Sequence, residues 1–192
     1  MDWSLFQHIN SLSIHTAWAH GLFSAFADYG IVLFALLLAV AGVMSLRQSN
    51  HVLLAGTAWS ALASVCALAL NQPVASWVNR ARPYAAHPSI LTLVHRGTDP
   101  SFMSDHAIVA SAVAAGLILV VKKLGVVAIV LALAMAFTRV YVGAHYPGDV
   151  LAGLTFGTAI TLVGAPVAGR LLLPLSQRAL QWHWVSAFAT ED

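Results

Sequence analysis

The sequence predicts an all-α membrane protein, a polytopic bundle of five to six transmembrane helices with an interfacial N-terminal helix. Of its 192 residues, 59% are hydrophobic and only 8% are charged, and the mean hydropathy is +0.81. Soluble domains carry about a quarter charged residues, so most of this chain is expected to lie in a bilayer. A span needs about 20 apolar residues, and 192 residues therefore accommodate one such domain, residues 1–192. The few basic residues are scattered, which argues against nucleic-acid binding.

Residues 1–27 are mixed in polarity rather than uniformly apolar. Large apolar side chains recur at helical intervals among His, Ser, Asn and Thr, and they include Trp3 and Trp18 as interface anchors. This pattern is typical of an amphipathic helix that lies in the membrane interface. A poorly apolar first span is the alternative.

Five apolar runs follow, and each predicts a transmembrane helix. They cover residues 29–46, 52–70, 105–121, 126–141 and 147–167. A polar connection, residues 74–104, separates the second run from the third. Its early part is expected to continue as helix as far as Arg82, because the residue before a proline resists helical geometry. The tail, residues 169–192, is expected to be an interfacial segment that includes Trp182 and Trp184.

Alternation of these spans sorts the basic residues onto two faces. One face receives Arg47, Lys122, Lys123, Arg170 and Arg178, and by the positive-inside rule it is the cytoplasmic face. The other face receives four arginines, but these lie in stretches that suggest chemistry rather than topology. We therefore expect a multi-pass protein of the plasma membrane with its reactive groups on the extracytoplasmic side.

The same alternation brings three polar stretches to one face, namely residues 79–84, 101–106 and 138–149. Together they supply Arg80, Arg82, Ser104, His106, Arg139, His145 and Asp149. Guanidinium groups bind phosphate and carboxylate oxygens through paired hydrogen bonds. Ser104 opens the third apolar run, where it can cap a helix whose free N–H groups bind anions. The predicted ligand is therefore a multiply charged oxyanion.

His145 and Asp149 are the candidate reactive pair. Pro147 is suited to the first position of a helix, and side chains four residues apart can meet. A carboxylate bonded to one imidazole nitrogen would fix the tautomer and leave the other nitrogen reactive. A structural histidine is the alternative, as is a metal site made by two histidines and a carboxylate. Ionisable groups in an apolar chain favour function, and the fixed positive charge of the arginines disfavours a metal ion.

Three motifs in residues 71–153 resemble those of the type 2 phosphatidic acid phosphatase superfamily of membrane lipid phosphatases, especially its bacterial undecaprenyl-diphosphate phosphatases. The family's Lys-x6-Arg-Pro motif is matched by Arg82-Pro83, with Arg80 nearby and Ala75 in place of the lysine. Its Pro-Ser-x-His motif is matched by Met103-Ser104-Asp105-His106. Its Ser-Arg-x5-His-x3-Asp motif is matched by Thr138-Arg139, His145 and Asp149.

The resemblance implies a membrane lipid phosphatase that needs neither metal nor cofactor. His145 would be the nucleophile that forms a phosphohistidine, Asp149 would orient it, and His106 would act as acid and base. The phosphate would be bound by Arg82, Ser104, Arg139, the backbone N–H of Asp105 and, more weakly, Arg80. Undecaprenyl diphosphate is the expected substrate. Phosphatidylglycerophosphate, phosphatidate or another prenyl phosphate is the alternative, and a small-anion or lipid transporter is the alternative of another class.

Overall fold

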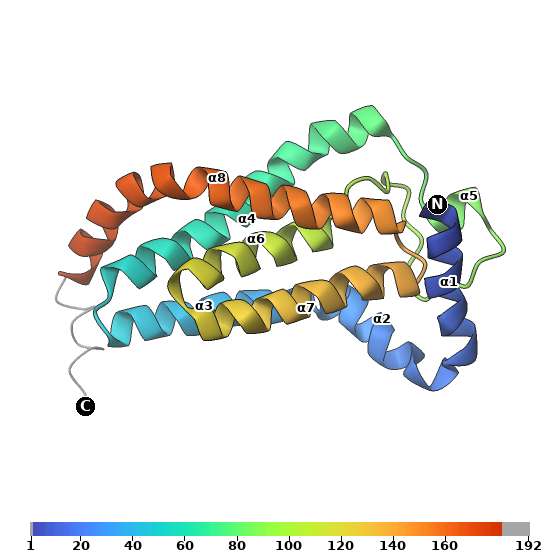
Figure 1. The fold of residues 1–192 in the computed structure, drawn as a ribbon, viewed down its shortest axis with the longest axis horizontal. Coiled ribbons are helices and arrows are strands. Elements are labelled where there is room, and N and C mark those ends of the chain that lie inside the picture. The colour runs from blue at the N-terminus through green and yellow to red at the C-terminus, as the bar shows by residue number, and fades with distance from the viewer. Residues whose placement is uncertain (1, 182–192) are drawn as a thin grey trace.

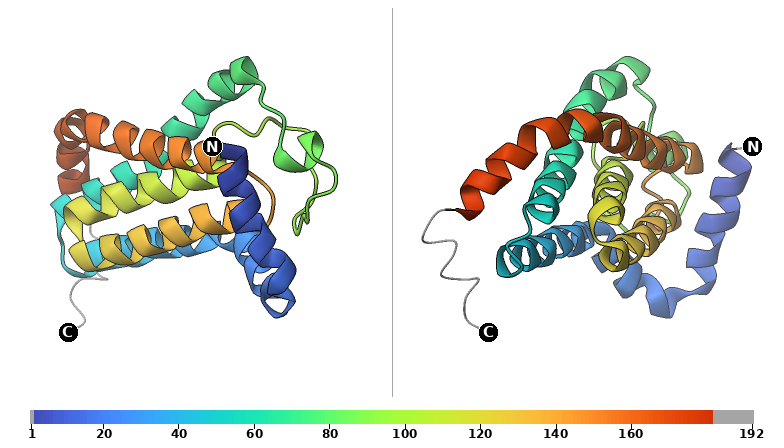
Figure 2. Two further views of the ribbon diagram at one scale, coloured as in Figure 1. Left: turned by 45° about the vertical axis from the view of Figure 1, so that its right-hand side comes forward. Right: turned by 60° about the vertical axis from the view of Figure 1, so that its left-hand side comes forward.

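The computed structural model describes residues 2–181, which are helical apart from the connections between helices (Figure 1). The helices are α1 (Asp2–His15), η1 (Ala17–Ala19), α2 (His20–Tyr29), α3 (Ile31–Arg47), α4 (His51–Val78), α5 (Pro83–Ala86), α6 (Asp105–Val120), α7 (Lys122–Tyr141) and α8 (Pro147–Leu180). Five of them, α3, α4, α6, α7 and α8, lie side by side along the long axis, and α1 lies across one end of this bundle (Figures 1 and 2). The predicted all-α membrane fold is confirmed.

Helix α6 is the centre of the bundle because it is apolar around its whole circumference. Nearly all its residues from Ala107 to Leu117 are buried against α4, α7 and α8. A helix without a polar face is typical of a buried position, and small residues let neighbouring helices approach closely. A Cβ added at Gly116 would collide with Ser60 on α4. The outer helices instead expose large apolar side chains, among them Leu133 and Val163, as a lipid-facing surface requires.

The number of membrane spans remains a prediction. Within residues 2–181, three helical segments are long and apolar enough to cross a membrane, namely His51–Ala86, α7 and α8. The pair formed by α2 and α3, bent by 55° at Gly30, makes a fourth if it is one span. Helix α6 is apolar but shorter, with 16 residues. The expectation of an interfacial N-terminal helix likewise remains a prediction.

Two helices continue past prolines that lie at the end of their apolar runs. Helix α4 passes Pro73 and ends at Val78, where Asn79 adopts the left-handed conformation (φ 44°) that commonly stops a helix. Helix α8 continues to Leu180 with Pro166 and Pro174 inside it, so it extends beyond residue 167, where the predicted span ends; the end of the span stays a prediction. Membrane helices tolerate proline when neighbouring groups satisfy the freed carbonyls. The expected anchors Trp182 and Trp184 lie outside the described residues.

Candidate active site

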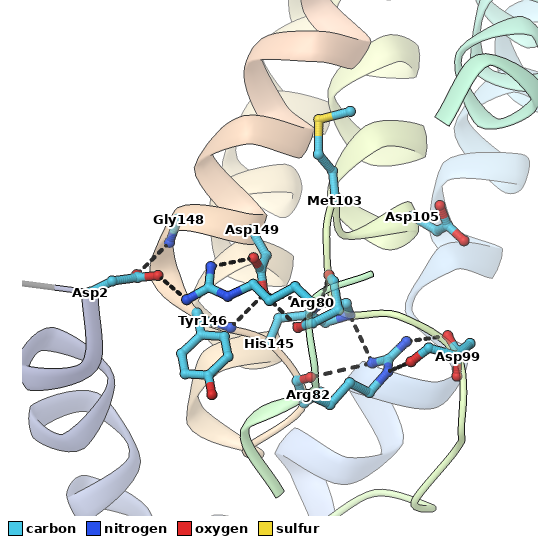
Figure 3. Close-up of polar contacts among 12 residues, drawn as sticks. Asp2, Arg80, Arg82, Asp99, Met103, Asp105, His145, Tyr146, Gly148 and Asp149 are labelled. Atoms are coloured by element: carbon cyan, nitrogen blue, oxygen red, sulfur yellow. Dashed lines mark hydrogen bonds and ion pairs between the residues drawn. The ribbon is translucent and has the colours of Figure 1, made fainter. Parts of the chain in front are cut away.

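The three polar stretches meet at the end of the bundle where α6 and α8 begin and α7 ends (Figure 3). A cavity of about 140 Å³ lies there, and Arg82, His106, Arg139 and His145 all line it. The remaining lining residues are Asn71, Gln72, Ala75, Asp99, Pro100, Met103 and Asp105. A second polar cavity of about 330 Å³ adjoins it and shares Arg82, Asp99, His106 and Arg139. The predicted convergence of separate stretches on one site is therefore present in the fold.

His145 sits in the tight turn between α7 and α8 and is almost completely buried. Gly143 allows this turn because it adopts φ +81°, a conformation that side chains with a Cβ rarely take. The backbone N–H groups of Ala144 and His145 both donate to the carbonyl of Arg139, which folds the turn back onto the end of α7. The turn thereby points the imidazole into the bundle rather than into solvent.

The hydrogen bonds of His145 define its tautomer. Its Nδ1 lies 2.8 Å from the backbone carbonyl of Ser101, which can only accept, so Nδ1 carries the proton. Its Nε2 lies 3.1 Å from Nη1 of Arg82, which can only donate, so Nε2 offers its lone pair. Burial, and then the charges of Arg139 and Arg82, hold the pKa of His145 well below its ordinary value. The ring is therefore neutral at pH 7, and the lone pair of its unprotonated Nε2 accepts a hydrogen bond from Arg82.

Asp149 lies fully buried in the first turn of α8 and does not bond directly to His145. Its Oδ2 is 3.9 Å from His145 Nδ1, which is too long for a hydrogen bond. Instead Oδ2 accepts from Ser101 Oγ at 2.5 Å and from the N–H of Tyr146 at 3.0 Å, and Oδ1 accepts from Arg80 at 2.7 Å. The direct bond between His145 and Asp149 that their spacing predicts is thus not formed.

Ser101 is the residue that joins the two, and its role was missed in the sequence. It is completely buried, and it presents its carbonyl to His145 and its hydroxyl to Asp149. Its own N–H donates to the carbonyl of Arg80 at 2.8 Å. Ser101 lies in a connection with no regular structure, so no helical periodicity relates it to either partner.

The arginines divide into two kinds. Arg82 and Arg139 line both polar cavities, whereas Arg80 lines neither of them. Arg82 pairs with Asp99 and also donates to Ala144 (Figure 3). Arg139 is buried and donates to the carbonyl of Ala27 at 3.1 Å.

Arg80 instead bonds to two carboxylates, those of Asp149 and Asp2, away from the cavities. In this structure the side chain of Arg80 is held at the carboxylates, and its predicted contact with phosphate stays a prediction. The ion pair between Arg80 and Asp149 suits a role in which Arg80 holds the carboxylate of Asp149 in place.

Two buried polar atoms near the first cavity have no hydrogen-bond partner among the described residues. They are Ser104 Oγ, at the start of α6, and Arg139 Nε. Unsatisfied buried donors cost free energy, so such atoms suit a ligand that accepts hydrogen bonds. Ser104 does not cap α6 with its side chain, contrary to one of its two predicted roles. Its hydroxyl remains free for the other role, that of a donor.

The remaining predicted positions are also brought together. The Asp105 side chain points away from Asp149 (Figure 3). Its Oδ1 accepts a hydrogen bond from the Asn71 amide at 2.8 Å. Its backbone N–H lies in the first turn of α6, as expected of an anion donor. Ala75, which stands where the resembled family has lysine, lines the first cavity together with Gln72. In residues 2–181 no group of three or more His, Cys, Asp or Glu could hold a metal ion.

Comparison with known proteins agrees with this geometry. The family model of the PAP2 superfamily matches residues 33–172. Undecaprenyl-diphosphatase BcrC of Bacillus subtilis is 31% identical over 161 residues, which is 83% of this chain and 80% of that protein. Bacitracin transport permease protein BcrC of Bacillus licheniformis is 29% identical and aligns with 82% of this chain and 75% of its own length.

A crystal structure gives independent support for the fold. It is described as a transmembrane PAP2 type phosphatidylglycerolphosphate phosphatase from Bacillus subtilis. It superimposes with a TM-score of 0.67 at 21% identity, and the match covers 88% of this chain and 87% of that one. At this identity the likeness establishes the arrangement of helices.

Proposed function

This chain belongs to the PAP2 superfamily and is a membrane phosphatase, and on that premise we propose that it hydrolyses undecaprenyl diphosphate to undecaprenyl phosphate and phosphate. The observation that carries the proposal is the cavity lined by His145, His106, Arg82 and Arg139, in which Nε2 of His145 is unprotonated and accepts a hydrogen bond from Arg82. The likeness to the undecaprenyl-diphosphatase of Bacillus subtilis, which extends over most of both chains, supports the choice of substrate.

The proposed first step is attack by His145 Nε2 on the terminal phosphorus. A nitrogen–phosphorus bond forms while the bond from phosphorus to the oxygen of undecaprenyl phosphate breaks. Since Nδ1 keeps its proton on the carbonyl of Ser101, the phosphorylated ring becomes positively charged. The carboxylate of Asp149, 3.9 Å from Nδ1, is close enough to stabilise that charge.

His106 is the proposed acid and base. It lines both polar cavities, so it can face the leaving oxygen and, later, a water molecule. In the first step it would donate a proton to the leaving group, and in the second it would take one from water as the water attacks phosphorus. Phosphate then leaves and His145 is restored with its electron pair.

Fixed positive charge takes the place of a metal ion in this proposal. Arg82 and Arg139 would neutralise the phosphoryl oxygens, together with the hydroxyl of Ser104 and the backbone N–H of Asp105. Arg82 bonds to His145 and Asp99 before substrate arrives, so it would exchange these partners for phosphate oxygens. Where the family has lysine this chain has a small alanine, and the amide of Gln72, which lines the same cavity, would contact the anion in its place.

An apolar cavity in the bundle fits the lipid part of such a substrate. Its volume is about 260 Å³, and α6, α7 and α8 line it with residues that include Ile118, Leu133 and Leu162. A polar pocket at the end of the bundle and an apolar cavity along its side suit an amphiphilic molecule that stays in the bilayer. This apolar cavity is thus the proposed resting place of part of the prenyl chain.

The proposed orientation puts the site on the extracytoplasmic side of the plasma membrane. Arg47 ends α3, and Lys122 and Lys123 begin α7, at the bundle end away from His145. Positive charge at membrane ends favours the cytoplasm, so the opposite end, with the site, faces outward.

Two other functions compete with this one. A different headgroup, such as phosphatidylglycerophosphate, phosphatidate or another prenyl phosphate, would use the same chemistry. Transport is the second, because one relative is named as a transport permease. Transport gives no reason for a buried histidine with a fixed tautomer beside two arginines.

A headgroup panel tests the proposal. The purified full-length chain is incubated in detergent with undecaprenyl diphosphate, phosphatidylglycerophosphate and phosphatidate, and released phosphate is measured. The expected result is the highest kcat/KM on undecaprenyl diphosphate. A preference for either glycerolipid would assign the alternative headgroup, and release from none of them would refute lipid phosphatase activity.

A further inference from the structure

Asp2, at the start of α1, contacts the first turn of α8. Its Oδ1 accepts from the N–H of Gly148 at 2.8 Å, and its Oδ2 accepts from Arg80 at 2.5 Å (Figure 3). Free N–H groups at the start of a helix favour a carboxylate. A residue 146 positions away in sequence thus holds the turn that carries Asp149.

Arg80 connects Asp2 with Asp149. One guanidinium nitrogen bonds to Asp2 and the other lies 2.7 Å from Asp149 Oδ1. The guanidinium carbon also lies 3.8 Å from the centre of the Tyr146 ring, a contact that further restrains the group. Neither Asp2 nor Arg80 lines either of the two polar cavities described above.

The rest of α1 is held against the same turn. Phe6 is completely buried, and its ring centre lies 5.7 Å from that of Tyr146. Asn10 is also buried, and its amide donates at 3.0 Å both to the carbonyl of Tyr141 and to that of Leu91. Helix α1 therefore contacts both ends of the turn that carries His145.

We propose that Asp2 is a positioning residue of the active site, which acts on His145 through Arg80 and Asp149. This inference rests on the proposed role of His145 as nucleophile. Arg80 also accepts, at its backbone carbonyl, the N–H of the Ser101 that orients His145. The N-terminal helix is then part of the catalytic apparatus, in addition to any contact it makes with the membrane.

The charge of Asp2 has a specific effect in this arrangement. Arg80 is shared between two carboxylates, so only part of its charge offsets that of Asp149. Without the charge on Asp2, Arg80 would pair with Asp149 alone and neutralise it more fully. Less negative charge would then remain to stabilise the positive ring that forms when His145 is phosphorylated.

The test compares Asp2→Asn with Ser4→Asn in the full-length protein. Both substitutions put an amide on α1, but Ser4 is exposed and lines neither polar cavity. Asp2→Asn is expected to lower kcat by about tenfold, which corresponds to a loss of about 1.4 kcal/mol in the stabilisation of the charged ring. Its KM should stay within about twofold, since Asp2 does not touch the cavity. Ser4→Asn should match the wild type in both constants.

A double-mutant cycle identifies the route. If Asp2 acts through Asp149, then Asp2→Asn should lower kcat by less than about twofold in an Asp149→Asn background. An undiminished tenfold loss in that background would refute the proposed route, as would an equal loss in Ser4→Asn. If Asp2 had only a structural role, Asp2→Asn would lower the fraction of folded protein, and its effect on kcat would be the same with and without Asp149→Asn.

A measurement without catalysis keeps the inference separate from the proposed reaction. Nitrogen NMR of histidine-labelled protein reports the tautomer of His145, with the signal identified by its loss in His145→Gln. The wild type should show the Nδ1–H form. Asp2→Asn should keep this tautomer, because the carbonyl of Ser101 still accepts the proton, but its ring nitrogen signals should shift as Arg80 neutralises Asp149 more fully. If the wild type released no phosphate from any lipid, the proposed reaction would fail. An unchanged His145 signal in Asp2→Asn would instead overturn the positioning role by itself.

Discussion

Replacing Asp149 by Asn should slow the enzyme far less than the loss of a directly bonded triad carboxylate. In such triads the change to Asn costs about 10⁴-fold, because the histidine takes the wrong tautomer. Here the backbone carbonyl of Ser101 accepts the Nδ1 proton, and the substitution leaves that carbonyl in place. The tautomer of His145 should therefore survive in Asp149→Asn.

The expected loss follows from the charge that disappears. A unit charge about 4 Å from the positive ring contributes about 4 kcal/mol at an effective dielectric constant of about 20. Arg80, 2.7 Å from the other carboxylate oxygen, opposes much of this. A remainder of about 1.4 to 2.8 kcal/mol corresponds to about a 10- to 100-fold slower phosphorylation of His145.

Stability must be measured beside the rate, because the carboxylate also accepts three hydrogen bonds. Ser101, Tyr146 and Arg80 all donate to it, and an amide cannot accept on its nitrogen. In either orientation of the substituted side chain, at least one donor faces its NH₂ group. Loss of a buried hydrogen bond to a charged group costs about 1.5 to 3 kcal/mol, so a lower melting temperature is expected.

The assay is single-turnover release of phosphate from undecaprenyl diphosphate, with the phosphoenzyme trapped at alkaline pH. Ser101→Ala is the matched variant, because it keeps the carbonyl and removes only the hydroxyl bonded to Asp149. Both variants should form phosphoenzyme more slowly than the wild type, within about 100-fold. A loss of about 10⁴-fold in folded Asp149→Asn would refute the assignment of the tautomer to Ser101.

Four further predictions concern the histidines, metal ions, orientation and pH. His145→Ala should form no phosphoenzyme, whereas His106→Ala should retain slow turnover, reduced by about 10²–10⁴-fold. The defect of His106→Ala should be smaller on undecaprenyl diphosphate than on phosphatidate, because the alkoxide that leaves phosphatidate needs the proton more. If a phosphoenzyme could still be trapped in His145→Ala, the nucleophile would have to be His106 rather than His145. Phosphate release should survive EDTA, because the arginines of the pocket supply fixed positive charge, and a loss restored only by a divalent ion would contradict this. In a Cys66→Ala background, a cysteine replacing the exposed Ala86 should react in intact cells with a reagent that cannot cross membranes; labelling only after lysis would reverse the orientation. Burial lowers the pKa of His145, so its contribution to folding stability should be present above the unfolded pKa of about 6.5 and be lost as the pH falls below it; thermal melts of His145→Gln should lack this part of the acid sensitivity, and an equal sensitivity would contradict it.

The meeting of the three polar stretches could be predicted from the sequence because it depends only on the order of the membrane-spanning helices along the chain. Apolar runs of sufficient length alternate across a bilayer, so the start of α6, the end of α7 and the start of α8 reach one face. Arg82, His106 and His145 were assigned to one site on that basis, and all three line one cavity. The continuation of α8 past Pro166 and Pro174 could not be predicted as well, because prolines that stop a soluble helix are tolerated between packed membrane helices.

The contacts inside the site depend on geometry that spacing does not determine. The rule that residues four apart meet holds within a helix, but His145 precedes Pro147 and lies outside α8. Tyr146 is extended, with ψ 156°, so it turns His145 off the helical face that carries Asp149. The gap that results is filled by Ser101, a residue 44 positions from His145, through contacts on both its backbone and its hydroxyl. His145 and Asp149, which the motif places side by side, are therefore connected through a distant segment that contains Ser101. Because Asp149 also bonds to Arg80, and Arg80 to Asp2, helix α1 can influence the reactivity of His145.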